Sequence, residues 1–433
     1  MKAVDLKQIP KPLIIGERIN TQGSRKAKNL VLADDYDGLI DLARTQVEDG
    51  AHCLDICVAT TERSDEHEFM LKLVKQLSLE IDAPLVIDST DPEVIESSVK
   101  QIPGRPIINS INLEGDGSRF EKLAPLMAKY GLPAISLCIG PGGMAKTPQE
   151  KLETAELLFE TGKKYGLKIE QFIFDVLTFT LATGEDEFLD AGKNTLDGIK
   201  LVKEKFPNAF TTLGLSNISF GLSPYARKVL NSVFLYHAVQ TGLDSAIVNA
   251  KEIIPIGEIN EKERKLAEDL IFNTHSDALS ELISYFEKVG PQSSIASKKV
   301  DVDPSWPPGK RANFRIVNRL KDGIQNDVVS AIAEKLGQEN LIKNTDGVLF
   351  LDASKEITHD GALRTLNEDL LSAMKEVGDK FGSGELILPF VLKSAECMKA
   401  AVSELEKYLL QKEGSSKGKL VLGTVYGDVH DIG

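Results

Sequence analysis

Carboxylate and amide side chains recur where short apolar runs end in the N-terminal half of the 433-residue chain. Side chains of these types can form paired hydrogen bonds with a ring edge that presents N–H donors beside a carbonyl, and charged pairs are roughly twice as strong as neutral ones. A single Asp at such a position would be interpreted as a helix N-cap, but six runs share the feature. The residues are Glu17 and Asn20, Asp55, Asp88, Asn109, Asp175, and Ser216 with Asn217.

The runs that carry these residues alternate with amphipathic segments from Leu13 to about Val289. Eight βα units in about 275 residues are typical of a (β/α)8 TIM barrel, in which the strand ends that build active sites all open on one face. A doubly wound open sheet is the alternative, and periodicity alone does not exclude it. The eight predicted strands are LIIGERIN, AHCLDICV, PLVIDST, PIINSIN, PAISLCIG, IEQFIFDVL, FTTLGLSN and DSAIVNA.

The composition changes after residue 290, which predicts further domains. Residues 291–310 are rich in Ser, Lys and Pro, as linkers are, and residues 311–411 carry apolar side chains at helical spacing. The sequence of residues 418–433 predicts one apolar strand followed by a turn. We therefore expect a barrel over 1–290, a linker, an α-helical bundle over 311–411 and the first strand of a truncated Rossmann-like domain.

Composition excludes several classes of function. The net charge of -14 argues against binding to nucleic-acid backbones, which requires a basic surface. No apolar run reaches the ~18 residues that a membrane-spanning helix needs, and no secretion signal begins the chain, so a cytoplasmic protein is expected. The four cysteines form no CxxC pair and no cluster with zinc-site spacing. They are Cys53, Cys57, Cys138 and Cys397.

The barrel segment resembles the pterin-binding family, which includes cobalamin-dependent methionine synthases, corrinoid methyltransferases and dihydropteroate synthases. The resemblance rests on residues 16–20, 88–90, 108–110, 174–175 and 214–221, and the last stretch looks most like the methyltetrahydrofolate branch. It implies that Asp88, Asn109 and Asp175 contact the pterin. It also implies that Asn217 contacts N5, where an amide can follow a change in protonation.

Three further residues are candidates for pterin contacts by the same resemblance. Glu17 and Asn20 either line the pocket or close the barrel floor, and Ser219 lies in the stretch that carries Asn217. Asp55 is interpreted either as a residue behind the site or as a helix cap. One departure from many relatives is Val176, which stands where they have Pro after the aspartate of the sixth strand.

The helical segment resembles the cap that covers the upper face of cobalamin (vitamin B12) in cobalamin-dependent methionine synthases. The resemblance implies that Phe381, Leu388, Val391 and Leu392 contact the corrin, although apolar stripes of this kind usually form bundle core. Residues 428–433 match the D-x-H-x-x-G start of a cobalamin-binding domain. This match implies that His430 is the axial cobalt ligand, but only in the full-length protein. Asp428 and Gly433 belong to the same motif.

The function implied by the resemblance is transfer of the N5-methyl group of 5-methyltetrahydrofolate to cob(I)alamin in methionine biosynthesis. A methyltetrahydrofolate:corrinoid protein methyltransferase outside that route is the alternative. Dihydropteroate synthase is disfavoured because the last strand, IVNAKE, lacks an S-x-R-x-H motif. A corrinoid carrier with an emptied barrel is disfavoured because the polar strand-end residues are present. No zinc-binding, homocysteine-activating motif occurs, so a separate protein or module is expected to supply that step, alongside the missing cobalamin domain.

Overall fold

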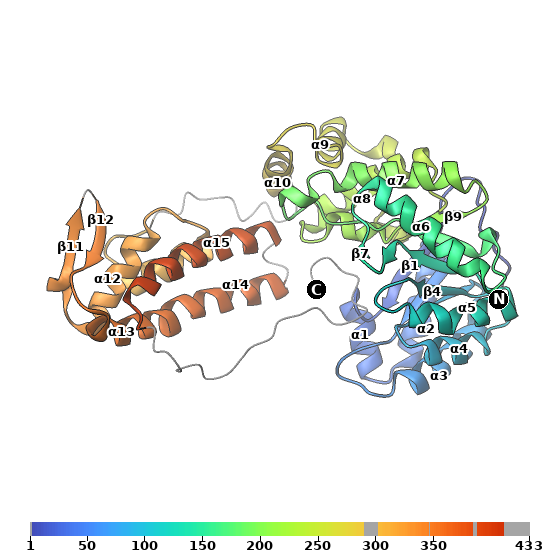
Figure 1. The fold of residues 1–433 in the computed structure, drawn as a ribbon, viewed down its shortest axis with the longest axis horizontal. Helices are drawn as coiled ribbons and strands as arrows, with labels where there is room; N and C mark the ends of the chain where they lie inside the picture. The colour runs from blue at the N-terminus through green and yellow to red at the C-terminus, as the bar shows by residue number, and fades with distance from the viewer. Residues whose placement is uncertain (1, 290–301, 346, 384–387, 411–433) are drawn as a thin grey trace. The chain divides into compact units, whose positions relative to one another are not determined.

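The computed structural model describes residues 2–289, 302–345, 347–383 and 388–410. For residues 382, 383, 388–390 and 392 only the backbone is described. These residues form two compact units (Figure 1). The first contains the residues up to Ser284 except 221–223, and the second contains residues 221–223 and those from Tyr285 onward. The predicted terminal strand lies outside the described residues.

The first unit is a closed barrel of eight parallel strands, which confirms the predicted fold. Neighbouring strands follow the order β10-β1-β2-β3-β4-β5-β8-β9. The ring closes where the backbone N–H of Ile247 donates to the carbonyl of Leu213 at 2.9 Å. The strands are β1 (Leu13–Asn20), β2 (Cys53–Cys57), β3 (Leu85–Asp88), β4 (Ile107–Ile111), β5 (Ala134–Leu137), β8 (Phe172–Asp175), β9 (Phe210–Thr212) and β10 (Ser245–Ile247).

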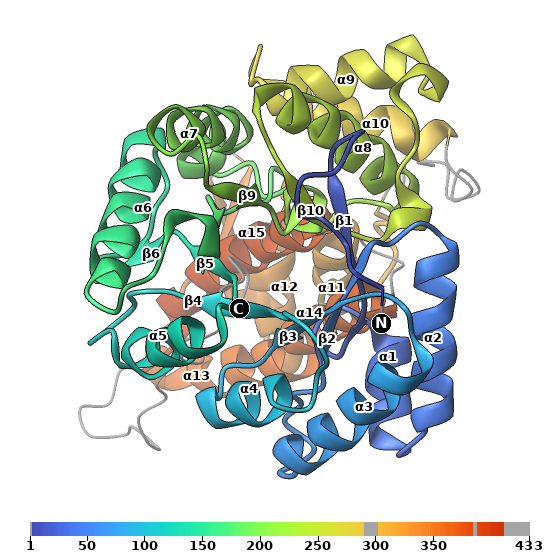
Figure 2. The same ribbon diagram turned by 90° about the vertical axis from the view of Figure 1, so that its right-hand side faces the viewer.

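Helices surround these strands and form a ring outside them (Figure 2). Their ends follow local sequence signals: Thr147 and Glu150 form a capping box at the start of α6, and Pro148 occupies its first turn. A two-stranded ribbon, β6 (Ile139–Gly140) with β7 (Gly143–Met144), follows β5. The helices of this segment are α1 (Arg25–Leu32), α2 (Tyr36–Glu48), α3 (Glu66–Glu80), α4 (Pro92–Val99), α5 (Ser118–Tyr130), α6 (Pro148–Lys163), α7 (Ala191–Lys205), α8 (Pro224–Thr241), α9 (Glu261–Ile271) and α10 (Ala278–Val289).

Most strand residues are buried because parallel strands pack against helices outside and against one another inside. All five residues of β2 are buried, including Asp55, whose exposed fraction is 1%. A buried carboxylate needs hydrogen-bond partners to offset its desolvation. We therefore expect other polar side chains inside the barrel to contact Asp55.

The second unit is a helical bundle with one feature that the sequence analysis did not predict. Two antiparallel strands, β11 (Ile342–Thr345) and β12 (Val348–Leu351), form a hairpin at one end of the bundle (Figure 1). Gly347 has a φ of +87°, which glycine adopts without strain. The helices are α11 (Pro308–Asn318), α12 (Ile324–Leu336), α13 (Lys355–Arg364), α14 (Leu371–Ser383) and α15 (Leu388–Leu405). None of the helices in the described parts of the chain is long and apolar enough to cross a membrane.

Candidate active site

Four polar side chains from the first four strands form a hydrogen-bonded network, which we call the acid–amide network: Asn20, Asp55, Asp88 and Asn109. The Asn20 amide donates to Asp55 Oδ2 at 3.2 Å and to Asp88 Oδ2 at 3.0 Å. The Asn109 amide donates to Asp55 Oδ1 at 3.1 Å. Two of these bonds join strands that are not neighbours in the sheet, β1 with β3 and β2 with β4. The four side chains must therefore meet inside the barrel.

A second group lies where β8 and β9 end. Asp175 accepts hydrogen bonds from the backbone N–H of Leu177 at 2.8 Å and of Gly214 at 3.3 Å. Asn217 follows in a 3-10 turn, Leu215–Ser219, and its backbone N–H donates to the carbonyl of Gly214 at 3.3 Å. The two residues are thus held by one short backbone segment that follows β9.

The sheet register places both groups at the same mouth of the barrel. Asp88 is paired with Asn109 across β3 and β4, and Asp175 with Leu137 across β5 and β8. Asp88 and Asp175 are the last residues of their strands, Asn109 pairs with Asp88, and Asn217 lies in the turn after β9; the strands are parallel. The structure therefore brings Asp88, Asn109, Asp175 and Asn217 to the carboxyl end of the barrel, the face on which active sites of this fold are built.

Burial changes the acidity of the carboxyl groups at this mouth. It raises the pKa of Asp55 to about 6, although the hydrogen bonds from Asn109 and Asn20 act to lower that pKa. Burial is the main cause that raises the pKa of Asp88 well above its ordinary value, and the nearby Asp55 charge is the second. Burial also raises the pKa of Asp175 to about 6. The site therefore favours a ligand that brings N–H donors to these carboxyl groups.

Glu17 and Ser219 hold the turn that carries Asn217. Glu17 Oε1 accepts from the Ser216 hydroxyl at 2.7 Å and from the backbone N–H of Asn249 at 3.2 Å. Arg227 of α8 donates to the Ser219 hydroxyl and to the Ser216 carbonyl, each at 3.2 Å. Ser219 is fully buried. Sequence reasoning missed Arg227, because a helical arginine eight residues beyond Ser219 gives no local signal of this contact.

A cavity of about 680 Å³ lies at the opposite mouth of the barrel. Its walls are formed by residues 2–7 and by the segments in which β2, β3, β4 and β9 begin, and they include Cys53, Leu85, Ile107 and Phe210. Residues at this face of a barrel contribute mainly to stability. The acid–amide network lies at the other end of the same strands, so this cavity is not the candidate active site.

The four predicted cap residues are described only in part. Val391 is half-buried and packs against the bundle core, and Phe381 is half-buried near the end of α14. The side chains of Leu388 and Leu392 are not described, and Asp428, His430 and Gly433 lie outside the described residues. Within the described ranges, no group of three or more His, Cys, Asp or Glu residues is arranged to hold a metal ion.

The raised pKa of Asp55 predicts how the stability of the barrel depends on pH. Between the ordinary value of 3.8 and about 6, the folded protein holds more protons than the unfolded chain. The free energy of unfolding therefore falls as the pH rises through this window. We expect Asp55→Asn to raise the free energy of unfolding at pH 7.5 by about 1–3 kcal/mol, with little effect near pH 4.

Urea unfolding at both pH values measures this difference. Asp41→Asn is the matched control, because Asp41 is an exposed carboxylate on α2 that pairs with Arg44. The control is expected to leave the pH dependence unchanged. An Asp55→Asn protein that loses stability equally at both pH values would show that the folded chain does not disfavour the ionised carboxyl.

Two family profiles match the chain. Residues 16–249 match the family described as pterin binding enzyme, and residues 315–406 match a B12 binding domain. The first match covers more than half of the chain and contains both groups of the candidate site. The chain belongs to the pterin-binding enzyme family.

More specific similarity comes from two curated relatives. The methionine synthases of Mycobacterium tuberculosis (strain ATCC 25618 / H37Rv) and Mycobacterium leprae (strain TN) are 40% and 39% identical to this chain over 440 and 444 residues. These alignments cover 100% of the chain and only 35% and 34% of the relatives, so the chain spans about a third of their length. A structure of Yersinia pestis dihydropteroate synthase with a pterine-sulfa conjugate matches 60% of this chain and 93% of its own at 18% identity, with a TM-score of 0.43.

Proposed function

We propose that the barrel binds 5-methyltetrahydrofolate and transfers its N5-methyl group to cob(I)alamin, as one step of cobalamin-dependent methionine synthesis. The observation that supports this most directly is the acid–amide network at the same barrel mouth as Asp175 and Asn217. The B12-binding match and the methionine synthase relatives support the choice of acceptor. This function requires a folate substrate and a cobalamin domain beyond the residues described.

The pterin ring is proposed to bind through its nitrogen-rich edge. Asp88 and Asp175 accept from ring N–H groups, and Asn109 bonds the neighbouring ring atoms. Asn20 already donates to two carboxylates, so its part is to hold Asp88 toward the ligand. Glu17 and Ser219 are proposed to act through the turn that they support, since the protein already supplies their hydrogen-bond partners.

Asn217 is proposed to assist the departure of the methyl group. When the C–N bond breaks, N5 keeps the bonding electron pair and takes a proton from water, which gives tetrahydrofolate. A hydrogen bond from the Asn217 amide to N5 would stabilise the negative charge that develops there. The structure shows no hydrogen bond between this amide and another described side chain, although the turn that carries it is held by Glu17 and Arg227.

The helical unit is proposed to cover the acceptor. Bound cob(I)alamin would supply a strongly nucleophilic cobalt as the acceptor of the methyl group. Phe381 and Val391 lie near the adjoining ends of the consecutive helices α14 and α15, and both are half-buried apolar side chains, which fits an apolar cover that excludes water. Leu388, Leu392, Asp428, His430 and Gly433 are proposed to complete the site in the longer protein. A separate module is proposed to activate homocysteine.

Single-turnover mixing tests this function. The chain is mixed with free cob(I)alamin and 5-methyltetrahydrofolate, and absorbance reports the disappearance of cob(I)alamin and the formation of methylcobalamin. We expect both changes at a rate that saturates with folate. A chain that binds the folate but methylates no cobalamin would reject the acceptor, whereas a chain that does not bind the folate would reject the proposal itself.

A further inference from the structure

A lysine that the methyl-transfer proposal does not use is fully buried beside the candidate site. Lys151 lies in the first turn of α6 and has an exposed fraction of 0%. Its ammonium donates to the carbonyl of Ala145 at 3.1 Å, to that of Leu177 at 3.3 Å and, at short range, to that of Val176. An ammonium has three N–H donors, so three backbone carbonyls satisfy it.

Two of these carbonyls belong to the loop that follows Asp175. Leu177 has a φ of +64°, a conformation that costs energy in a residue with a side chain and that persists only where its surroundings impose it. The backbone N–H of Leu177 donates to Asp175 Oδ1 at 2.8 Å, while the Thr195 hydroxyl donates to the Leu177 carbonyl at 3.0 Å. One peptide segment therefore connects the lysine ammonium to the carboxylate.

We propose that Lys151 is a positioning residue for pterin binding, in which its buried ammonium fixes residues 176–177 and thereby orients the Asp175 carboxylate. This inference rests on the proposed function, because it takes Asp175 as a pterin contact. Lys151 itself would not touch the substrate, since its three donors are all used within the protein.

The surroundings of Lys151 support a fixed position. A Cβ at Gly198 would lie 2.7 Å from Lys151 Cδ, so the stem of the lysine fits closely against α7. The charge faces Phe179, whose ring centroid lies 5.2 Å from Nζ. Burial lowers the pKa of Lys151 to about 8, while Cys138, Asp175 and Glu150 act in the opposite direction. The ammonium is therefore still the main form at neutral pH.

A double-mutant cycle tests whether Lys151 acts through Asp175. Lys151→Met keeps an unbranched side chain one heavy atom shorter and removes its donors, and Asp175→Asn removes the charge that Lys151 is proposed to orient. By calorimetry, we expect Lys151→Met to weaken methyltetrahydrofolate binding about tenfold in the wild-type chain and less than about twofold in the Asp175→Asn chain. A role confined to stability would give the same small change in both.

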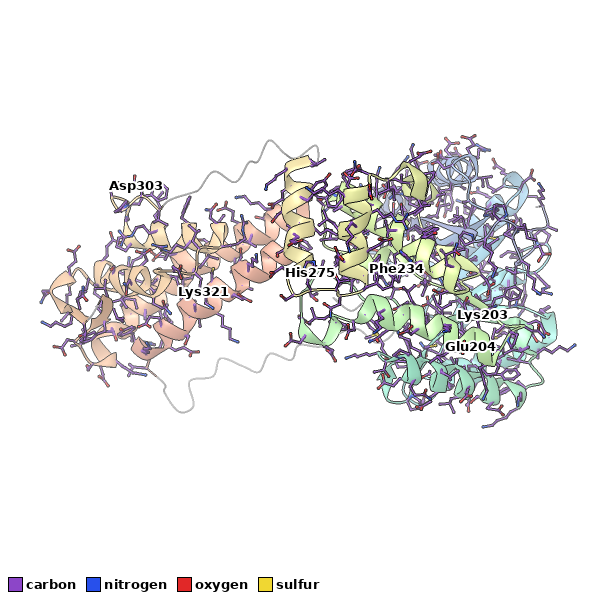
Figure 3. All side chains as sticks on the ribbon, turned by 90° about the horizontal axis from the view of Figure 1, so that it is seen from above. Lys203, Glu204, Phe234, His275, Asp303 and Lys321 are labelled. Carbon is purple, nitrogen blue, oxygen red and sulfur yellow. The ribbon has the colours of Figure 1, made fainter. Side chains whose placement is uncertain are left out.

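Lys203→Met is the matched control. Lys203 is a largely buried lysine of α7 (Figure 3) that donates to the Ala209 carbonyl at 2.7 Å and to Asp244 at 2.8 Å, beside the segments in which β9 and β10 begin. Its replacement is expected to lower the unfolding temperature without changing folate affinity. If Lys151→Met does not fold, Thr195→Val removes the other side-chain donor to the loop and is expected to show the same coupling to Asp175.

The outcomes separate this inference from the proposed function. Equal losses of affinity in the wild-type and Asp175→Asn backgrounds, or no loss in either, would overturn the role of Lys151 and leave the proposed function standing. A wild-type chain that binds no methyltetrahydrofolate would overturn the proposed function and the inference together.

Discussion

Replacing Asn217 with Ala is expected to slow methyl transfer about 100-fold while changing methyltetrahydrofolate affinity less than about threefold. The amide is proposed to donate to N5, where negative charge develops only as the C–N bond breaks. A bond that strengthens in the transition state affects the rate more than the binding. Single-turnover absorbance measures the rate, and calorimetry measures the affinity.

Asn208→Ala is the control for this substitution. Asn208 is exposed and precedes β9, at the opposite end of the barrel, so its replacement is expected to change neither quantity. The same loss of rate and affinity in Asn217→Ala would assign Asn217 to ground-state binding. An unchanged rate would remove it from the reaction.

Replacing Asp88 with Ala is expected to weaken methyltetrahydrofolate binding about 100-fold. The substitution removes a carboxylate proposed to accept from the pterin edge, and it leaves the Asn20 amide with only Asp55 as an acceptor. Buried polar groups that lose a partner carry their full desolvation cost. Calorimetry with 5-methyltetrahydrofolate gives the affinity, and circular dichroism checks that the barrel remains folded.

Asp197→Ala serves as the matched control for Asp88. Asp197 is exposed on α7, and its loss is expected to leave affinity unchanged. If Asp88→Ala binds the folate as tightly as the wild type, the acid–amide network is not the pterin site. A loss of methyl-transfer rate at saturating folate, with affinity intact, would instead place Asp88 in the chemical step.

The barrel was predictable because its strands are buried on both faces and therefore appear as short apolar runs. Each predicted run contains an observed strand, including the three-residue strands β9 and β10. The hairpin β11–β12 was missed because apolar residues there were assigned to helices, although Asp346-Gly347 between two short runs is a common hairpin signal. The helical spacing over residues 311–411 also gives no sign of the break after α11, where Arg319 has a φ of +64°.

The candidate site was predictable only where its residues end strands. Asp88, Asn109 and Asp175 lie at the same mouth because parallel strands bring their carboxyl ends together. The role of Asp55 was left open, since only the closed barrel shows that it joins Asn20 to Asn109. Helical residues such as Lys151 act over long sequence separations, and spacing along the chain gives no indication of them.

The closure of the ring between Leu213 and Ile247 has a consequence for how binding and folding are linked. The candidate site draws on both sides of that seam, from Asn20 in the first strand to Asn217 after β9. No half-barrel would contain a complete set of contacts. Any opening that separates β9 from β10 would also separate the residues of the site. A bound folate would therefore slow hydrogen exchange of the backbone amides in all eight strands of the barrel.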